Sequence, residues 1–525
     1  MILQTYLPIE ISSILKYIGI FLLAFLVYLV HRILIRPYLY LRKYRKYSNV
    51  MTMNTFLPLI GDFKNSIDCM NNNKVHYAFR KEKSKEFAKY DIHAALDGPT
   101  PCISILSSKA IEEFIQLQKT SNIDRLFINY GITAMIPHSL VGRKSGQKTM
   151  QRRKNMTTWL GLNGASSYIP HMIDCCKKIL DSMDNEKEVN IMHCMNTLTF
   201  DVFIDILFGN DVEKLVSDLH PYINDDGKVE DLSLRDILIR IGKCYIEQYY
   251  NITTFIAPFL AENKLVNPYK RNDKNLTVFR ESIRKIAKSS KDTTSVGYKF
   301  MTNQNCTEEE KLDDLIGIML AGTETTAHSL VSCLYFLNKY PEALKKLREE
   351  LKREGFTKTD DFINQCTVEK FQSCTYLNSV VKETLRRDTA VSETFDYVSS
   401  SDIKICDVPI KKGTKIRIDA VSSHFDERKW LEPESFIPER FDFDSEFYQK
   451  SKKMGKVADI YSRRSFSHGN RNCPGQSFAL LEMKLVIAYF VTHIDFNYSK
   501  EDLSNENIGF GMGSQFVPNI TIRKL

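Results

Sequence analysis

The segment 466–475, Phe-Ser-His-Gly-Asn-Arg-Asn-Cys-Pro-Gly, surrounds one cysteine with residue types that suit a thiolate ligand. Gly469 and Gly475 allow close approach of the backbone and positive φ, and the proline fixes the chain directly after the cysteine. Phe466 can shield the Cys473 sulfur from water, which tunes a bond between iron and sulfur. Most free cysteines are small buried hydrophobes, but this pattern indicates instead that Cys473 binds a metal.

Arg471 stands two residues before Cys473, where its guanidinium can bind a carboxylate as a charged fork. Haem b offers both partners, an iron for the thiolate and propionates for the arginine. The remaining cysteines of the twelve are scattered and form no C-x-x-C pair. This scatter favours a reducing compartment and argues against both a disulfide framework and a zinc site.

A long helix is predicted over residues 310–338 from the helical spacing of their apolar side chains, and it contains the sequence 321–326, Ala-Gly-Thr-Glu-Thr-Thr. A glycine inside a helix costs about 1 kcal/mol relative to alanine, so something should require Gly322. A flat haem or dioxygen lying against the backbone is one reason. A threonine hydroxyl that bonds to a carbonyl one turn earlier can also open the helix locally. On these residues alone, an ordinary helix with small residues for packing is equally supported.

Two further segments complete a pattern. Glu383 and Arg386 lie in a predicted helix over 376–387, and the sequence 436–441, Phe-Ile-Pro-Glu-Arg-Phe, follows it. A Glu and an Arg three residues apart on a helix are usually a surface pair worth a few tenths of a kcal/mol, roughly. Taken in chain order, however, the four segments resemble the signature of the cytochrome P450 superfamily. The resemblance covers roughly residues 55–525.

The resemblance implies a fold and an activity. The fold is mainly α with smaller β-sheets (α+β), the cytochrome P450 fold, preceded by an N-terminal membrane-anchor helix. The activity is that of a haem-thiolate monooxygenase, which inserts one oxygen atom of O₂ into an apolar organic substrate such as a lipid, sterol, fatty acid or xenobiotic. Electrons would come from an NADPH-dependent flavoprotein reductase, with cytochrome b5 as a further candidate partner, because this chain shows no G-x-G-x-x-G fingerprint.

The resemblance also assigns roles to residues of this chain. Glu324 and Thr325 would deliver protons to the oxygen site. Glu383, Arg386 and Arg440 would lock the fold beneath the haem. The residues expected to bind haem b, with Cys473 as the axial ligand of its iron, are Phe466, Gly469, Arg471, Cys473, Gly475, Arg153, Ala321 and Gly322.

The chain departs from the family pattern at two propionate contacts. Thr149 stands where a tryptophan is expected, although Arg153 fits the arginine four residues later. After the pair that corresponds to Glu383 and Arg386, many members of the family have prolines and then a further arginine. This chain has Asp-Thr-Ala-Val-Ser at 388–392 instead of the prolines, and a tyrosine near the position of the expected arginine. Tyr397 and His424 are the candidate replacements.

An apolar run over residues 17–30 is shorter than the roughly 20 residues that a spanning helix needs, but it can extend back to Ile11. A cleavable signal peptide would carry its positive charge before the run. Here the basic residues follow it: Arg32, Arg36, Arg42, Lys43, Arg45 and Lys46. By the positive-inside rule that flank stays cytosolic. We therefore expect a signal-anchor over 1–47 and a haem domain over 48–525, on the cytosolic side of the endoplasmic reticulum membrane.

The net charge of +8 is modest for 525 residues and forms no stripe outside the juxtamembrane segment, so nucleic-acid binding is not expected. Two other functions remain open. An isomerase or dehydratase that acts on a peroxide would keep the haem thiolate, but such family members typically lose the acid–threonine pair that this chain keeps. A non-catalytic haem carrier or sensor would have no use for the acid–threonine pair, so the presence of that pair argues against this function.

Overall fold

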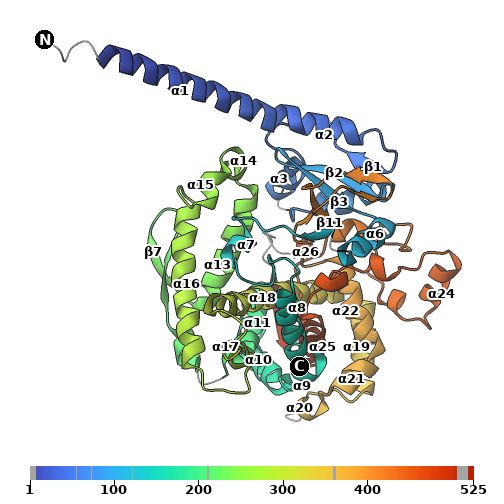
Figure 1. Ribbon diagram of the computed structural model, residues 1–525. Coiled ribbons are helices and arrows are strands. Elements are labelled where there is room, and N and C mark those ends of the chain that lie inside the picture. The colour runs from blue at the N-terminus through green and yellow to red at the C-terminus, as the bar shows by residue number, and fades with distance from the viewer. Residues whose placement is uncertain are drawn as a thin grey trace.

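The computed structural model describes residues 7–54, 56–72, 74–120, 122–209, 212–358, 362–504 and 518–525, with side chains from residue 13 on except those of 213 and 214. Residues 1–6 of the predicted anchor segment lie outside this description. The chain folds into a large helical body beside smaller β-sheets, which confirms the predicted fold class (Figure 1).

The largest sheet has the strand order β1-β2-β3-β11-β8-β4 and joins distant parts of the chain. Its strands are β1 (Val50–Thr52), β2 (Ile92–Asp97), β3 (Thr100–Ile105), β4 (Ile123–Arg125), β8 (Tyr397–Ser399) and β11 (Lys415–Ile418). The β2–β3 pair is antiparallel, whereas β11 runs parallel to β3 and antiparallel to β8. Other strands are β5 (Glu188–Asn190), β6 (His220–Ile223), β7 (Val229–Leu232), β9 (Ile403–Ile405), β10 (Val408–Ile410), β12 (Ile494–Tyr498) and β13 (Asn519–Lys524).

Helices dominate the rest of the described chain. The longer ones are α1 (Leu7–Val30), α2 (Arg36–Tyr44), α3 (Phe63–Asn71), α6 (Ser108–Lys119), α8 (Gln147–Trp159), α10 (Ile169–Ser182), α11 (Ile191–Phe208), α13 (Leu234–Glu247), α16 (Tyr269–Ser289), α18 (Glu308–Lys339), α19 (Pro341–Arg353), α22 (Thr375–Arg387), α24 (Glu446–Lys453) and α25 (Gln476–His493). Short ones are α4 (Ala78–Glu82), α5 (Ser84–Phe87), α7 (Ile132–Met135), α9 (Leu162–Ser166), α12 (Glu213–Ser217), α14 (Ile252–Ile256), α15 (Pro258–Glu262), α17 (Val296–Met301), α20 (Phe362–Gln365), α21 (Val368–Ser373), α23 (Ala420–His424) and α26 (Lys500–Ser504). Short 3-10 turns lie at Gln248–Tyr250, Pro438–Phe441, Ile460–Ser462 and Gly469–Arg471.

The helix predicted over 310–338 is α18, and its ends follow from its sequence. Thr307 accepts a hydrogen bond from the backbone of Glu310, whose side chain accepts one in return from the backbone of Thr307. This capping box satisfies two free N–H groups at the helix start, and the acidic first turn suits the positive end of the helix dipole. The helix predicted over 376–387 is α22, which begins one residue earlier.

The main apolar core surrounds α18, which packs against α11 and α25. α11 is apolar on almost all sides, and most of it is buried inside the domain. A helix that is hydrophobic all round belongs in the core of a large domain or in a membrane, and burial assigns α11 to the core.

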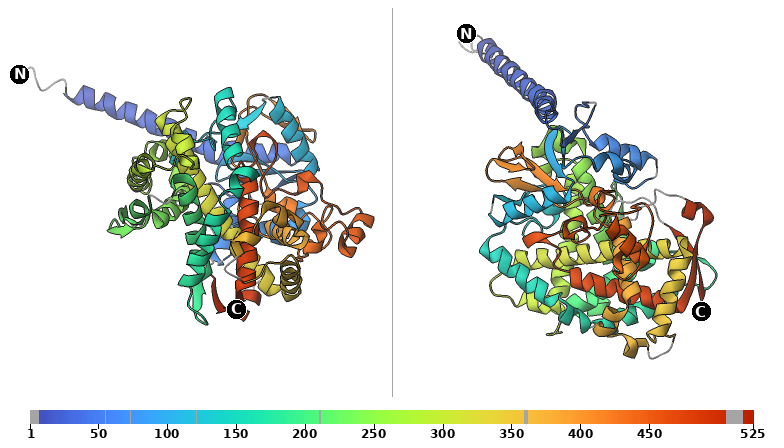
Figure 2. Two further views of the ribbon diagram at one scale, coloured as in Figure 1. Left: turned by 90° about the horizontal axis from the view of Figure 1, so that it is seen from below. Right: turned by 90° about the vertical axis from the view of Figure 1, so that its right-hand side faces the viewer.

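The N-terminal helix projects from the domain in every view (Figures 1 and 2). A π-helical turn at His31–Ile35 joins α1 to α2, and the helix Ser13–Tyr44 is long and apolar enough to cross a membrane. The side chains of its apolar window are not buried. α2 is tied to the sheet region, because Tyr40 donates a hydrogen bond to the Cys102 carbonyl at 2.6 Å and Tyr44 donates one to the Pro409 carbonyl at 2.8 Å. The chain thus carries a candidate membrane anchor whose last helix is tied by hydrogen bonds to the rest of the fold.

Candidate functional site

The loop around Cys473 ends directly before α25. Its backbone closes on itself, because the Cys473 N–H donates to the Phe466 carbonyl at 2.9 Å. Gly469 has φ 77°, which confirms the predicted need for glycine there. The same prediction was wrong for Gly475, whose φ of −92° is open to any residue. Gly475 instead directs its backbone N–H at the Cys473 sulfur.

The sulfur of Cys473 lies in a half-buried position with one hydrogen-bond donor and one cation nearby. Burial raises the pKa of the Cys473 thiol, while the Gly475 amide and the Arg153 guanidinium act in the opposite direction. Phe466, expected to shield the sulfur, is half-buried in the same loop. A backbone N–H donor and Arg153 of α8, which was expected to bind haem, therefore both lie at this cysteine.

Arg471 belongs to the loop itself, whereas Arg153 reaches the loop from α8. Arg153 donates hydrogen bonds to the backbone carbonyl of Asn472 and, at 2.7 Å, to its side-chain Oδ1. Arg471 is buried and donates to the Leu140 carbonyl at 2.6 Å and to the Ser145 hydroxyl at 3.3 Å. Burial, together with the nearby cation of Arg125, lowers the pKa of Arg471 to about 10.

Arg125 is a member of this cluster that sequence reasoning missed. It ends β4, and strand pairing sets it opposite Tyr397 of β8. Its guanidinium carbon lies 4.4 Å from the centre of the Tyr397 ring, and its buried Nε has no hydrogen-bond partner among the described residues. A single arginine in a short strand gives no spacing signal in the sequence. Only the strand pairing brings it beside Arg153 and Arg471, with both of which it interacts electrostatically.

The three arginines fit a group with carboxylates. Among the described residues, Arg125, Arg153 and Arg471 have no carboxylate within ion-pairing distance. Partly buried cations are costly unless a counter-charge meets them. Two propionates at the edge of a haem would supply that charge next to the Cys473 sulfur. The residues present therefore fit haem b.

The two candidate replacements for the absent family residues lie in different surroundings. Tyr397 is buried between the Phe114 ring, with 5.1 Å between ring centres, and the Arg125 guanidinium. His424 accepts a hydrogen bond from the Arg464 backbone at Nε2, and its pKa is lowered to about 3 by burial and by nearby arginines. Tyr397 thus adjoins the arginine cluster, whereas His424 is a neutral group of the structural network described below. Thr149 is half-buried in α8.

The acid–threonine stretch lies in the middle of α18. Ala321 is exposed and Thr325 half-buried, although the helix around them is largely buried. Thr325 donates its hydroxyl to the Ala321 carbonyl at 2.6 Å, which confirms the predicted bond to the previous turn. The predicted local opening of the helix was wrong, because α18 continues unbroken through this turn. The hydroxyl bond is accommodated without a break in the helix.

Gly322 has a packing reason to be glycine. A Cβ built on it would lie 2.2 Å from the Phe203 ring of α11. Phe203 in turn contacts Phe478 of α25, with 5.2 Å between ring centres. The glycine therefore lets three core helices meet, and room for dioxygen beside Ala321 and Gly322 stays a prediction.

Glu324 is a buried acid without a polar partner. Its side chain makes no hydrogen bond or ion pair with any described residue, and a Cβ built on Gly242 of α13 would lie 3.4 Å from its Oε1. Burial raises the pKa of Glu324 to about 8. The carboxyl group is therefore largely protonated at neutral pH, which is the state that a proton donor needs.

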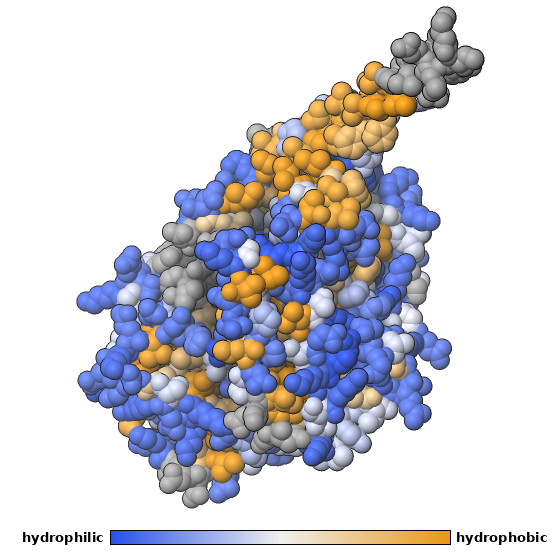
Figure 3. All heavy atoms as spheres, turned by 90° about the vertical axis from the view of Figure 1, so that its left-hand side faces the viewer, coloured by the Kyte–Doolittle hydropathy of each residue, from blue (hydrophilic) through white to orange (hydrophobic). Residues whose placement is uncertain are grey.

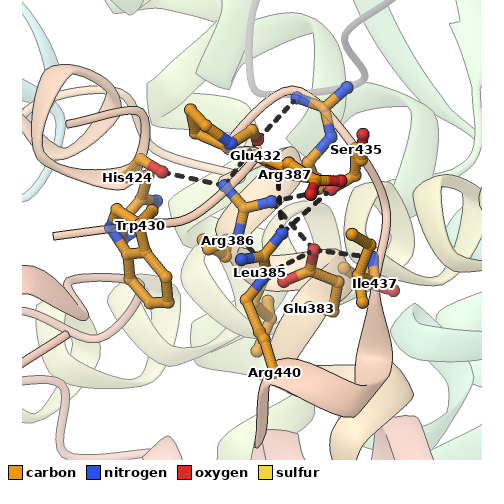
Figure 4. A network of polar contacts seen from close by, with 12 residues as sticks. Glu383, Leu385, Arg386, Arg387, His424, Trp430, Glu432, Ser435, Ile437 and Arg440 are labelled. Atoms are coloured by element: carbon orange, nitrogen blue, oxygen red, sulfur yellow. Dashed lines mark hydrogen bonds and ion pairs between the residues drawn. The ribbon is translucent and has the colours of Figure 1, made fainter. Parts of the chain in front are cut away.

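Glu383, Arg386 and Arg440 form a buried ion network (Figure 4). Arg386 binds both Glu383 oxygens at 2.8 Å, and Arg440 Nε binds Oε1 at 3.0 Å. Burial alone would raise the pKa of Glu383, but the two arginines outweigh it and lower the pKa. The remaining guanidinium N–H groups donate to the backbone carbonyls of His424, Leu431, Glu432, Pro433 and Ser435.

The network ties two segments more than fifty positions apart, because the Ile437 N–H also donates to Glu383 at 2.9 Å. Each of its charges meets an opposite charge or a carbonyl, as burial requires. The structural role expected for the three residues agrees with this geometry.

Comparison with known proteins finds relatives of a single family, which match most of the chain. Cytochrome P450 3A17 of Cavia porcellus is 26% identical over 441 residues, which cover 80% of this chain and 81% of that protein. Cytochrome P450 4V2 of Homo sapiens is 23% identical over 504 residues, which cover 91% of this chain and 90% of that protein. The family model named Cytochrome P450 matches residues 53–518. The chain therefore belongs to the cytochrome P450 family, whose members are generally haem-thiolate monooxygenases.

Proposed function

We propose that this chain is a membrane-anchored monooxygenase that inserts one oxygen atom of O₂ into an apolar organic substrate. Haem b would be held by Cys473 as the axial thiolate, with Arg125, Arg153 and Arg471 binding its propionates. When bound, haem supplies dioxygen activation, and a thiolate ligand favours O–O cleavage. The observation that carries the proposal is the Cys473 sulfur, which accepts a hydrogen bond from the Gly475 amide beside three arginines that have no carboxylate within ion-pairing distance among the described residues.

The chain's own contribution to the chemistry is proton delivery. Glu324 keeps a proton near neutral pH because it is buried without a counter-charge. Thr325 presents its side chain at the exposed turn of α18, where its hydroxyl is anchored on the Ala321 carbonyl. A hydroxyl so placed can accept a proton on its oxygen and pass its own to a reacting oxygen atom. General acid delivery of this kind contributes about 10²–10⁴-fold to a rate.

The anchor and the redox partners complete the proposal. The basic residues after α1 favour a catalytic domain on the cytosolic side of the endoplasmic reticulum membrane. An NADPH-dependent flavoprotein reductase on that side would supply electrons, with cytochrome b5 as a second donor. The Cavia porcellus and Homo sapiens relatives named above cover 80% and 91% of the chain at low identity, so they support the reaction class and leave the substrate to experiment.

Substitution of Thr325 by valine tests the proposal. The change keeps the side-chain shape and removes the hydroxyl, so haem content should stay normal while more of the NADPH consumed ends as hydrogen peroxide. The matched control is Thr323→Val in the same turn, because the buried Thr323 hydroxyl has no hydrogen-bond partner in the part of the chain that the structure describes. Peroxide release per NADPH, measured with added reductase, should rise in Thr325→Val only. Equal peroxide yields in the two variants and the wild type would refute the proton-delivery mechanism.

A further inference from the structure

A cavity of about 650 Å³ lies where the anchor meets the catalytic domain. Five separate segments line it: the end of the anchor helix, the β2–β3 turn, the stretch after β4, the region 249–262 and the loop before β11. Its apolar part includes Leu39, Tyr40, Phe255 and Pro258. The cavity is therefore amphipathic, and it is distinct from the loop that carries Cys473.

Positive charge dominates the lining. Arg32, Arg36, Lys43 and Lys412 line the cavity, and none has a carboxylate within 4.0 Å among the described residues. Other lining cations are already neutralised, because Lys411 pairs with Asp402 at 2.6 Å and Lys415 pairs with Asp97 at 2.6 Å.

One acid, Glu262, lines the cavity without an ion pair among those that the structure describes. Lys411 and Lys415 each have an acidic partner, whereas the other four cations of the lining have none among the described residues. The remaining cations are left with a net positive charge that an anion can balance.

The cavity lies directly beside the N-terminal helix. It begins at the foot of α1, whose side chains are exposed and apolar, and it is bordered by α14 and α15 (Figure 1). Around those helices Ile252, Phe259 and Leu265 are each more than half exposed. Figure 3 shows apolar side chains gathered along the anchor and at its base, above a largely hydrophilic domain. Two exposed apolar surfaces thus flank a cationic cavity.

We propose that this juxtamembrane cavity binds the phosphate-bearing head group of an anionic membrane phospholipid. Arg36, Lys43 and Lys412 contact the phosphate, and the apolar lining takes the glycerol and the first part of the acyl chains. Basic pockets beside membrane helices bind anionic head groups by the same chemistry. Two contacts fix the position of the Lys43 ammonium, which lies 4.6 Å from the centre of the Tyr44 ring and 3.4 Å from the Pro409 carbonyl oxygen. The proposal rests on the anchor and the cavity and does not depend on the reaction.

The test uses the full-length holoenzyme in a zwitterionic detergent with dihexanoyl phosphatidylserine as a soluble probe, and calorimetry reports binding. The variant R36Q/K43Q/K412Q removes three cations from the cavity. Each cation near such a surface is worth roughly fivefold in binding, so affinity should fall on the order of 100-fold. The control R42Q/R45Q/K46Q removes the same charge from exposed positions of the same segment that do not line the cavity. Screening by solvent should limit its effect to about twofold.

Further arms identify the source of the anion. Dihexanoyl phosphatidylcholine should bind much more weakly than the serine lipid, and inorganic phosphate should not displace it. Displacement by inorganic phosphate alone would make this a free-phosphate site and overturn the proposal. Equal losses in the two triple variants would mean diffuse attraction, which also overturns it. So would a fatty acid that displaces the lipid and shifts the haem absorption, because the cavity would then be a substrate entrance.

A single exposed substitution keeps the test valid if the triple variant fails to fold. Lys412→Glu lies in a surface loop and reverses one charge at the cavity. Two charge units at roughly fivefold each predict a loss of about 25-fold. Lys46→Glu, equally exposed and outside the cavity, is its control. A Lys412→Glu protein with wild-type affinity would overturn the proposal.

Discussion

Replacing Glu324 by glutamine removes a carboxyl group that the fold buries in α18 without a polar partner. Its pKa is about 8 in the folded chain and 4.5 as an ordinary glutamate. Between these two values the folded state holds a proton that the unfolded state has lost. Stability is therefore fully retained below pH 4.5 and falls as pH rises toward 8.

The magnitude follows from the two pKa values. One pKa unit is worth about 1.4 kcal/mol, so this group should cost the wild type about 2 kcal/mol of unfolding free energy between pH 6 and pH 7.5. Glutamine does not titrate, so the difference in stability between variant and wild type should change by that amount. At about 2.1 cal/mol/K of unfolding entropy per residue, this equals roughly 2 °C in melting temperature for a chain of this size.

The assay is thermal unfolding of the wild type and Glu324→Gln side by side at pH 6 and pH 7.5. Other titrating groups contribute equally to both proteins and cancel in the difference. Glu482→Gln is the matched control, because Glu482 of α25 is also buried and burial raises its pKa. Its two carboxyl oxygens have no hydrogen-bond partner among the described residues. Both variants should flatten the pH dependence of stability, but only Glu324→Gln should raise peroxide release. A Glu324→Gln protein with the pH dependence of the wild type would refute the buried-acid reasoning.

Three further predictions concern the network, the packing and the anchor. Glu383→Gln leaves two buried guanidinium groups without a counter-charge and should cost about 3–5 kcal/mol in denaturant unfolding, whereas Glu439→Gln, which breaks a partly exposed pair with Lys346, should cost about 1 kcal/mol or less. Gly322→Ala should lose about 1–3 kcal/mol by overpacking, and Phe203→Leu in the same protein should restore part of the loss; no restoration would contradict the packing reason. Protease added to sealed microsomes should digest the catalytic domain, and complete protection would reverse the topology.

The helices of the site could be predicted from the sequence because their signals are local. α18 and α22 begin and end within two residues of the predicted bounds, since apolar spacing and a capping box act over a few turns. The ion network was named correctly, but on family resemblance. No local signal relates Glu383 to Arg440, whose contact depends on the path of the chain between them.

Other features were missed or misjudged because tertiary contacts create them. Arg125 reaches Tyr397 only through the pairing of β4 with β8. The juxtamembrane cavity likewise joins five segments that the sequence keeps far apart. The positive φ expected at Gly475 failed for another reason. The turn around Cys473 is completed at Ser467 and Gly469, so the residue before α25 can adopt an ordinary conformation.

The central claim is that the Cys473 thiolate ligates the haem iron. The direct measurement is the absorption spectrum of the reduced, carbon monoxide-bound protein for the wild type, Cys473→His and the control Cys306→Ser, which changes a half-buried cysteine elsewhere. Haem content is measured in parallel, so that loss of ligation is distinguished from loss of haem. We expect the thiolate-type band in the wild type and in Cys306→Ser, and its absence in Cys473→His. A thiolate-type band that survives in Cys473→His would contradict the account.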